Sequence, residues 1–151
     1  MCVLNEALIK ALGISQPAID KVLARERQEL ERRELAYCGN QSLELGDRIV
    51  ILVDDGLATG ASMRAAILAA RAQHPARIVA AAPVAARETC RELGLEAEEI
   101  VCVHTPEHFE GVGQWYEDFL PTTDEEVRSL LEEGAKIRRA QPGQTLLQEE
   151  L

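Results

Sequence analysis

Two adjacent carboxylates, Asp54 and Asp55, follow an unbroken apolar run, and a short stretch of small residues begins three positions later. That stretch consists of Ala58, Thr59, Gly60, Ala61 and Ser62. Successive backbone N–H groups in such a stretch can surround a phosphate, and a following helix N-terminus favours the negative charge. The carboxylates are acceptors, which suit vicinal sugar hydroxyls or a divalent cation. A phosphate site beside a hydroxyl site indicates a sugar phosphate as the ligand, with Thr59 and Ser62 as additional hydroxyl donors.

The acidic pair has two other interpretations. Two carboxylates at a strand end often form a solvated turn, and in other classes of protein, such as receiver domains, they belong to a magnesium site. A receiver domain does not need the small residues Thr59–Ser62 at the start of the next helix. With that loop present, we interpret Asp54 and Asp55 as ligands of ribose hydroxyls.

The segments around this motif alternate between strands and helices. Residues 49–53 form a β-branched run that is typical of a strand covered on both faces. Further strands are predicted at 77–84 and 100–103, and helices at 63–73 and 87–93. This order predicts an α/β fold, a parallel sheet with flanking helices and right-handed crossovers. In open sheets of this kind ligands bind at the carboxyl ends of the strands, where the acidic pair lies.

The N-terminal part of the chain is predicted to be helical. A first helix over residues 2–12 ends at Gly13, and a long helix over 17–37 ends at Gly39 and Asn40.

The C-terminal part is predicted to contain one more helix, over 124–133, capped by Thr122 or Thr123. We expect one domain over residues 1–135 and a flexible tail over 136–151.

The composition limits the function classes. The chain has 46% hydrophobic but only 3% aromatic residues, so it can form an aliphatic core and is neither disordered nor a good candidate for an all-β sandwich. The net charge of -10 argues against partners such as nucleic acid or an anionic membrane. Any phosphate must therefore be bound locally.

The cysteines and the hydropathy indicate a compartment. The cysteines are Cys2, Cys38, Cys90 and Cys102, and no C-x-x-C pair is present. This spacing is typical of reduced thiols. The sequence has no apolar run of membrane-spanning length and no leader-like N-terminus, so we expect a cytoplasmic protein.

The acidic pair and its loop resemble the phosphoribosyl-pyrophosphate (PRPP) loop of type I phosphoribosyltransferases, in which an apolar strand, two acids and a Thr/Gly/Ser loop follow one another. The segment Trp-Tyr-Glu-Asp-Phe at 115–119, followed by Thr-Asp-Glu-Glu-Val at 123–127, resembles the C-terminus of a bacterial group of predicted phosphoribosyltransferases with unassigned substrate. Residues 3 to about 133 fit that group.

The resemblance implies roles for single residues. Asp54 and Asp55 would bind the ribose 2′- and 3′-hydroxyls, and Ala58–Ser62 would bind the 5′-phosphate. Trp115 and Tyr116 would approach the nucleobase, although aromatic residues more often pack in cores or subunit contacts. The implied ligands are PRPP or a nucleoside monophosphate, with Mg2+ bound through PRPP. The implied reaction of nucleotide metabolism transfers phosphoribosyl to a nucleobase or another nucleophile and releases pyrophosphate.

Two departures from the family pattern matter. Ala58 stands where hypoxanthine-type members carry a carboxylate base, so the loop is more similar to the adenine and orotate types. Family members also carry a strand and a pyrophosphate-binding loop before the PRPP loop, and nothing upstream of Arg48 has that pattern. We therefore expect the N-terminal part of the domain to be missing, and a homo-oligomer that covers the exposed sheet edge.

The second departure leaves two alternatives open, a non-catalytic module that senses PRPP or a nucleotide, and an inactive fragment. The sequence does not define the acceptor substrate.

A cluster around His104 and His108, with Cys102 and Glu107 nearby, resembles a metal site only superficially. Pro106 interrupts the helix that would align the two histidines, so we interpret them as loop residues.

Overall fold

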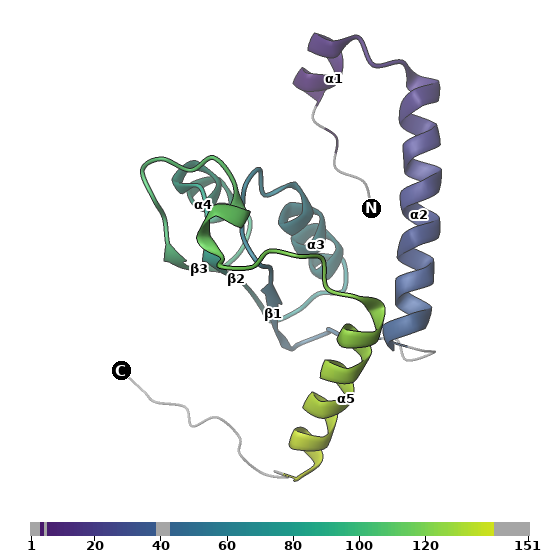
Figure 1. The fold of residues 1–151 in the computed structure, drawn as a ribbon, viewed down its shortest axis with the longest axis vertical. Coiled ribbons are helices and arrows are strands. Elements are labelled where there is room, and N and C mark those ends of the chain that lie inside the picture. The colour runs from purple at the N-terminus through teal and green to yellow at the C-terminus, as the bar shows by residue number, and fades with distance from the viewer. Residues whose placement is uncertain (1–3, 5, 39–42, 141–151) are drawn as a thin grey trace. The chain divides into compact units, whose positions relative to one another are not determined.

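The computed structural model describes residues 4, 6–38 and 43–140 (Figure 1). The chain divides into two compact units. Unit 1 comprises Met1–Ile14 and Leu43–Phe119, and unit 2 comprises Ser15–Ser42 and Leu120–Leu151. The acidic pair and the small-residue loop both belong to unit 1.

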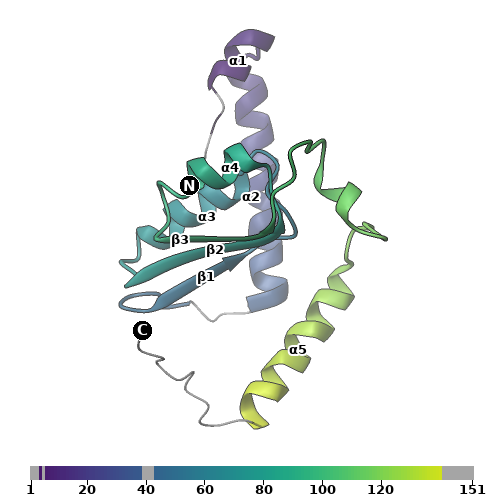
Figure 2. The same ribbon diagram turned by 90° about the vertical axis from the view of Figure 1, so that its left-hand side faces the viewer.

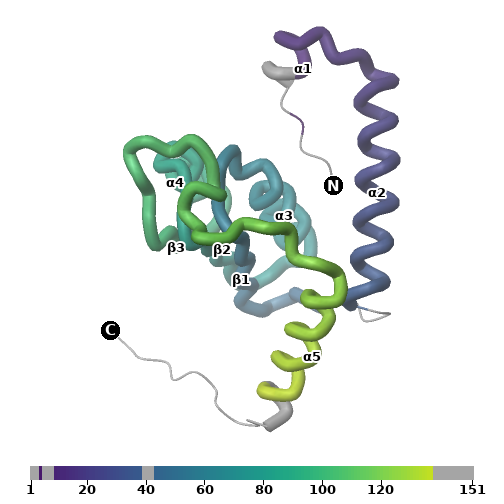
Figure 3. Tube along the Cα trace, viewed as in Figure 1, coloured from purple at the N-terminus to yellow at the C-terminus, as the bar shows by residue number. Residues whose placement is uncertain are grey.

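Unit 1 is built on a parallel sheet of three strands in the order β1-β2-β3. Its elements in chain order are α1 (Glu6–Leu12), β1 (Ile49–Val53), α3 (Ala61–Arg71), β2 (Arg77–Val84), α4 (Arg87–Leu93), β3 (Glu99–His104) and the 3-10 helix η1 (Val112–Trp115). Figure 3 lets the chain be followed from β1 through α3 to β2 and through α4 to β3. This confirms the predicted α/β fold, including the strand at 77–84 and the helix at 87–93.

The register sets the carboxyl ends of the strands side by side. Val53 is paired with Ala81, and Val84 with His104. Beyond the strands, Leu57 and Ala85 form one more parallel bridge. The residues that follow β1 therefore lie beside the end of β2.

The core lies between the sheet and the two helices α3 and α4, which cover the same face of the sheet (Figure 2). Its largest fully buried side chains are Leu57, Ile67, Ile78 and Leu93. The small side chains of β2, among them Ala80 and Ala82, let the helices approach closely.

The prediction that β1 is covered on both faces is wrong within unit 1. Its residues alternate between half-buried and exposed, and Ile51 and Val53 are 63% and 74% exposed. Within unit 1, α3 and α4 both pack on one side of the sheet, so the other face of β1 stays exposed. An unbroken apolar run does not show how many faces of a strand are covered.

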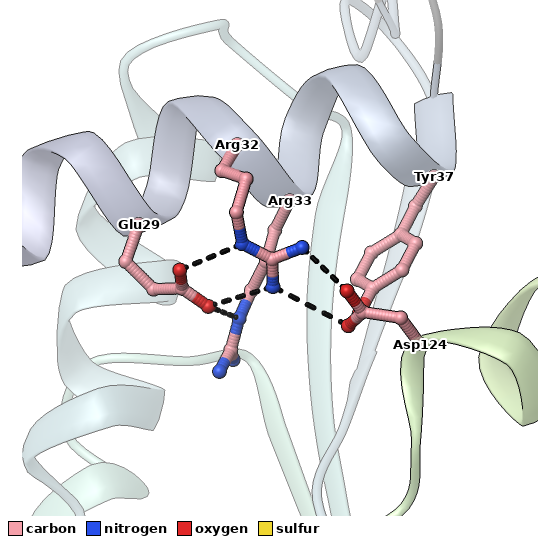
Figure 4. A network of polar contacts seen from close by, with 5 residues as sticks. All are labelled: Glu29, Arg32, Arg33, Tyr37 and Asp124. Atoms are coloured by element: carbon pink, nitrogen blue, oxygen red, sulfur yellow. Dashed lines mark hydrogen bonds and ion pairs between the residues drawn. The ribbon is translucent and has the colours of Figure 1, made fainter.

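Unit 2 contains the helices α2 (Gln16–Cys38) and α5 (Asp124–Ala140). Arg32 forms ion pairs with Glu29 and with Asp124, and Asp124 also accepts a hydrogen bond from the Tyr37 hydroxyl (Figure 4). These contacts join the C-terminal half of α2 to the first turn of α5. The same carboxylate of Glu29 binds Arg33 at 2.7 Å.

Helix α5 begins with a capping box. The Thr123 hydroxyl accepts the Glu126 N–H at 3.3 Å, and the Glu126 carboxylate accepts the Thr123 N–H at 2.8 Å. This confirms the cap at Thr123. The helix is longer than the predicted 124–133 and includes residues 136–140 of the expected tail, because a glycine such as Gly134 is tolerated inside a helix at about 1 kcal/mol.

Where the structure describes them, the N-terminal predictions are confirmed except at the start of the first helix, because Leu4, which lies within the predicted 2–12, is not helical and α1 begins at Glu6. Helix α1 ends at Leu12 and is followed by Gly13 in the left-handed region, with φ of 62°. Helix α2 begins and ends within one residue of the predicted 17–37. The predicted stop at Gly39 and Asn40 lies outside the described residues. None of the helices in the described part of the chain has the length and apolar character needed to cross a membrane.

The expectation of reduced cysteines is wrong for one pair. Cys90 of α4 and Cys102 of β3 form a disulfide, with their Cα atoms 7.3 Å apart. The sequence gives only their separation along the chain. The pairing arises because α4 packs on β3, which places the two side chains opposite each other. Cys38 is an exposed free thiol.

Candidate functional site

The acidic turn that follows β1 is fixed by backbone hydrogen bonds. Asp54 continues the ladder by donating its N–H to the Ala81 carbonyl at 3.1 Å. The Asp54 carboxylate accepts the N–H of Asp55 at 3.0 Å, and the Asp55 carbonyl accepts the Tyr116 hydroxyl at 2.7 Å. A carboxylate has about four lone-pair sites, so one internal bond leaves Asp54 able to accept hydroxyls from a ligand.

Leu57, the residue that precedes the loop, is anchored in the core. Leu57 is 1% exposed and donates its N–H to the Val84 carbonyl at 3.0 Å, while its own carbonyl accepts the N–H of Ala86 at 2.9 Å. Both backbone groups of Leu57 are thus held by the connection between β2 and α4. The exposed residues Ala58 and Thr59 therefore start from a fixed position.

The end of the loop forms the start of α3. Gly60 is the N-cap with φ of 69°, and its carbonyl accepts the first intrahelical bond, from Arg64 N–H at 2.8 Å. The N–H groups of Ala61, Ser62 and Met63 precede that bond and have no intrahelical acceptor. Only the N–H of Ala61 meets a side chain within the loop, Thr59 Oγ1 at 3.5 Å. The helix therefore presents unpaired donors and its positive dipole end, as an anion site requires.

The loop and one of the two carboxylates share a pocket. Its volume is about 140 Å³, and it is lined by Asp54 and by every residue from Gly56 to Met63. The predicted residues Ala58, Thr59, Gly60, Ala61, Ser62 and Asp54 are thus brought together. Asp55 is exposed on the same turn and does not line the pocket.

The aromatic segment packs beside this turn. The ring of Trp115 meets that of His104 edge-on, with centroids 4.7 Å apart, and Tyr116 lies 5.2 Å from Phe119. Neither Trp115 nor Tyr116 lines the pocket. Tyr116 uses its hydroxyl on the Asp55 carbonyl, so its contact to the site is one of support.

The positive charge that the start of α3 offers to a ligand comes from backbone N–H groups and not from Arg64. Arg64, one turn into α3, is bound to Glu96 at 2.6 Å and to Glu92 at 3.2 Å, and the hydrogen bond that it donates to Glu96 raises its pKa. Because this guanidinium is engaged with two carboxylates, a bound phosphate would rely on N–H groups and hydroxyls.

His104 and His108, at and beyond the end of the third strand, do not form a metal cluster with the neighbours that the structure describes. His108 lies in the loop after β3, as expected, whereas His104 is the last residue of that strand. Among the described residues, no group of three or more His, Cys, Asp or Glu side chains could hold a metal ion.

A family comparison decides what kind of domain carries this loop. The family model described as "Phosphoribosyl transferase domain" matches residues 2–116, which include β1, the acidic pair and the loop. The chain belongs to the phosphoribosyl transferase domain family. This confirms the resemblance seen in the residues at 50–62.

Two relatives of this phosphoribosyl transferase domain come from Mycobacterium tuberculosis, strains CDC 1551 / Oshkosh and ATCC 25618 / H37Rv. Both carry the name "Putative phosphoribosyl transferase", and each is 37% identical over 131 residues, 86% of this chain. The chain spans 30% of the length of these relatives. The crystal structure of TT1426 from Thermus thermophilus is similar with a TM-score of 0.64 and 37% identity, over 79% of this chain and 57% of that one.

Two residues of the phosphoribosyl transferase domain that support the site were not found from the sequence. A Cβ on Gly56 would lie 2.5 Å from Val112 Cγ1, so η1 closes against the acidic turn. Thr89 of α4 donates its hydroxyl to the Ala58 carbonyl at 2.5 Å. Val112 stands between two glycines in a pattern typical of a flexible turn, and Thr89 is a single polar residue in a helix. Nothing in either pattern indicates a long-range contact.

Proposed function

We propose that this phosphoribosyl transferase domain binds the ribose 5-phosphate part of PRPP in the pocket formed by Asp54 and residues 56–63. The observation that supports the proposal is that one pocket is lined both by the hydrogen-bond donors of the loop and by the acceptor carboxylate of Asp54. The N-terminus of α3 and the hydroxyls of Thr59 and Ser62 suit the 5′-phosphate. Asp54 and Asp55 suit the 2′- and 3′-hydroxyls of the ribose, because a carboxylate accepts several hydrogen bonds from hydroxyl groups.

The residues present fit a Mg2+ ion that is held mainly by the phosphates of the substrate and only partly by the protein. Mg2+ prefers oxygen ligands and is commonly held by one or two carboxylates together with substrate phosphates. Asp54 and Asp55 supply at most two such carboxylates, and the described residues offer no larger cluster. Bound there, the cation would offset charge on the pyrophosphate of PRPP.

The reaction proposed for the whole enzyme is phosphoribosyl transfer. The bond between ribose C1 and the pyrophosphate oxygen breaks with its electron pair going to pyrophosphate, and a nucleophile forms a new bond to C1 and loses its proton. Positive charge grows at C1 in the transition state. Asp54 and Asp55 would stabilise that charge while they fix the sugar, and the loop would fix the phosphate, so the domain acts by positioning and electrostatics.

Calorimetry with ribose 5-phosphate and with inorganic phosphate tests the assignment of the carboxylates. Replacing both acids, Asp54→Asn with Asp55→Asn, is expected to weaken ribose 5-phosphate binding about tenfold or more relative to inorganic phosphate, since only the sugar hydroxyls need the carboxylates. The ratio of the two affinities is the informative quantity, because the loss of two negative charges strengthens the binding of any anion. An unchanged ratio would remove the ribose role.

The matched control removes the same charge from the other end of β1. Glu44 and Asp47 precede the strand and do not line the pocket, so the double variant Glu44→Gln with Asp47→Asn leaves the lining intact. This control should keep the ratio of the two affinities at its original value.

Turnover is tested separately, by pyrophosphate release from PRPP with Mg2+ across purines, pyrimidines and orotate. Release with one of these acceptors supports transfer and names the substrate class. Binding without release would instead favour a module that senses PRPP or a nucleotide.

A further inference from the structure

Thr89 occupies an unusual place in unit 1. It is 7% exposed, and it is the one polar or charged side chain buried in the described part of the chain. It lies in the first turn of α4, far along the chain from the loop, and α4 contributes nothing to the pocket lining. A buried hydroxyl costs free energy unless it is hydrogen-bonded, so its partner matters.

That partner is the backbone of the loop. Thr89 Oγ1 donates to the Ala58 carbonyl at 2.5 Å, across 31 residues of sequence. In a trans peptide the carbonyl and the following N–H point in opposite directions. Holding the Ala58 carbonyl toward α4 therefore directs the N–H of Thr59 away from α4, a helix that contributes no residue to the pocket lining. The hydroxyl determines which way this peptide presents its donor.

The methyl group of Thr89 fixes the next turn of the loop. A Cβ on residue 60 would lie 2.6 Å from Thr89 Cγ2 and 3.1 Å from Leu93 Cδ1. Gly60 therefore packs its backbone directly on α4, with its φ of 69°. Thr89 thus contacts both ends of the 58–60 segment, by hydrogen bond at one and by van der Waals contact at the other.

We propose that Thr89 is a positioning residue that orients the 58–59 peptide and seats Gly60, so that the loop presents its N–H groups to phosphate. The proposal rests on the proposed function, because it assigns Thr89 a role in the phosphate site. It predicts that the hydroxyl controls affinity for the phosphate group itself. Inorganic phosphate and ribose 5-phosphate should then respond to its loss by the same factor.

The test compares three variants by calorimetry with inorganic phosphate and ribose 5-phosphate. Thr89→Val keeps the shape, removes the hydroxyl and leaves the Ala58 carbonyl without its donor, so both ligands should bind about tenfold more weakly. Thr89→Ser keeps the hydroxyl and should restore most of the affinity. If Thr89→Val does not fold, Thr89→Ala provides the same loss of hydroxyl in a smaller side chain.

The control separates positioning from stability. Ile78→Val removes one buried methyl group from the same core, in β2 and outside the pocket lining. It should lower the melting temperature and leave both affinities unchanged at a temperature where the protein is folded. Equal affinities for Thr89→Val and the original protein would overturn the role of Thr89 and leave the proposed function intact. A failure of the original protein to bind either ligand would overturn both.

Discussion

Gly60 shows how strongly one residue constrains the loop. It combines a left-handed backbone, with φ of 69°, and a position where any side chain would collide with Thr89. The positive φ alone costs a residue with a Cβ about 1 kcal/mol. The collision adds to this, because the β-branched Thr89 side chain is stiff and cannot move away without losing its bond to Ala58.

We therefore expect Gly60→Ala to weaken phosphate binding as well as stability. The loop would have to move away from α4, which shifts the N–H groups at the start of α3, and the affinity for ribose 5-phosphate should fall about tenfold or more, as expected for a mispositioned charge-assisted site. Calorimetry measures the affinity, and thermal melting measures the stability.

The matched control for that substitution is Gly13→Ala. Gly13 has nearly the same φ, 62°, but no atom lies within 4 Å of the position its Cβ would take. This variant should show the backbone cost alone and leave phosphate binding unchanged. Equal effects of the two substitutions on binding would contradict the role of loop packing.

Residue types and their spacing predicted part of the pocket lining, Asp54 and residues 58–62, but not Gly56, Leu57 or Met63, and they included Asp55, which lies outside the lining. Asp54 and the loop at 58–62 could be found because small residues that follow two acceptors at a strand end suit an anion site, which separates this motif from a solvated acidic turn. Tyr116, Val112 and Thr89 support that loop from other elements, and their partners are backbone atoms. A backbone carbonyl or a glycine Cα has no sequence signature, so these contacts could not be predicted.

At the scale of elements, the Cys90–Cys102 disulfide links α4 to β3. A crosslink that closes a loop of about a dozen residues stabilises a protein by about 3 kcal/mol, mainly through the unfolded chain. Cys90→Ser, or reduction by a dithiol, should lower the free energy of unfolding of unit 1 by about that amount. Thermal melting with and without reductant measures it.

The exposed thiol Cys38 provides the control for the disulfide. Cys38→Ser should have the same melting temperature as the original protein when both are measured without reductant, and again when both are measured with it. A melting temperature of the original protein that does not respond to reductant would contradict a stabilising crosslink.

The contact of α2 with α5 is expected to depend on pH. Arg32 and the Tyr37 hydroxyl lower the pKa of Asp124 from 3.8 to about 2. A carboxyl group whose pKa is lowered in the folded state stabilises that state above its unfolded pKa, and this contribution is lost as the pH falls toward the folded value. The helix content of α2 and α5 should thus decline between about pH 4 and pH 2, which circular dichroism measures.

Asp124→Asn tests the assignment of this transition. It should lower the stability of unit 2 near neutral pH and reduce its dependence on acid. Glu125→Gln, the next residue of the same helix, is the matched control and should retain the full dependence. Two other carboxyl groups of unit 2 account for the part that remains: Glu29, whose pKa is lowered to about 2 by Arg32 and Arg33, and Glu126, whose pKa is lowered by its hydrogen bonds with Thr123.

The order and type of the elements followed from periodicity, whereas their lengths and covered faces did not. The strand at 77–84 was predicted to the residue because an apolar run follows Arg77, shortly after His74 and Pro75. The length of α5 was underestimated at Gly134. The face of β1 that unit 1 leaves exposed was not predicted, because an apolar run shows only that its residues are apolar and not how many faces of the strand are covered.

At the scale of the whole molecule, the division into two compact units separates the proposed ligand site from the α2–α5 contact. The pocket lies wholly in unit 1, and the Arg32–Asp124 network lies wholly in unit 2. A chain with more than one compact unit need not unfold in a single step. Ligand and acid should therefore act on different parts of the same chain.

Hydrogen exchange with and without ribose 5-phosphate tests this division. A ligand that binds only the folded state stabilises it by about 2.7 kcal/mol at a concentration about one hundred times its dissociation constant. Exchange should therefore slow in β1, β2, α3 and α4, whose opening exposes the pocket, and stay unchanged in α2 and α5. Ribose without phosphate is the control and should protect neither unit, because the donors of the loop have no anion to hold. Equal protection of α2 and α5 would show that the two units open together, and no protection anywhere would remove the phosphate site from the loop.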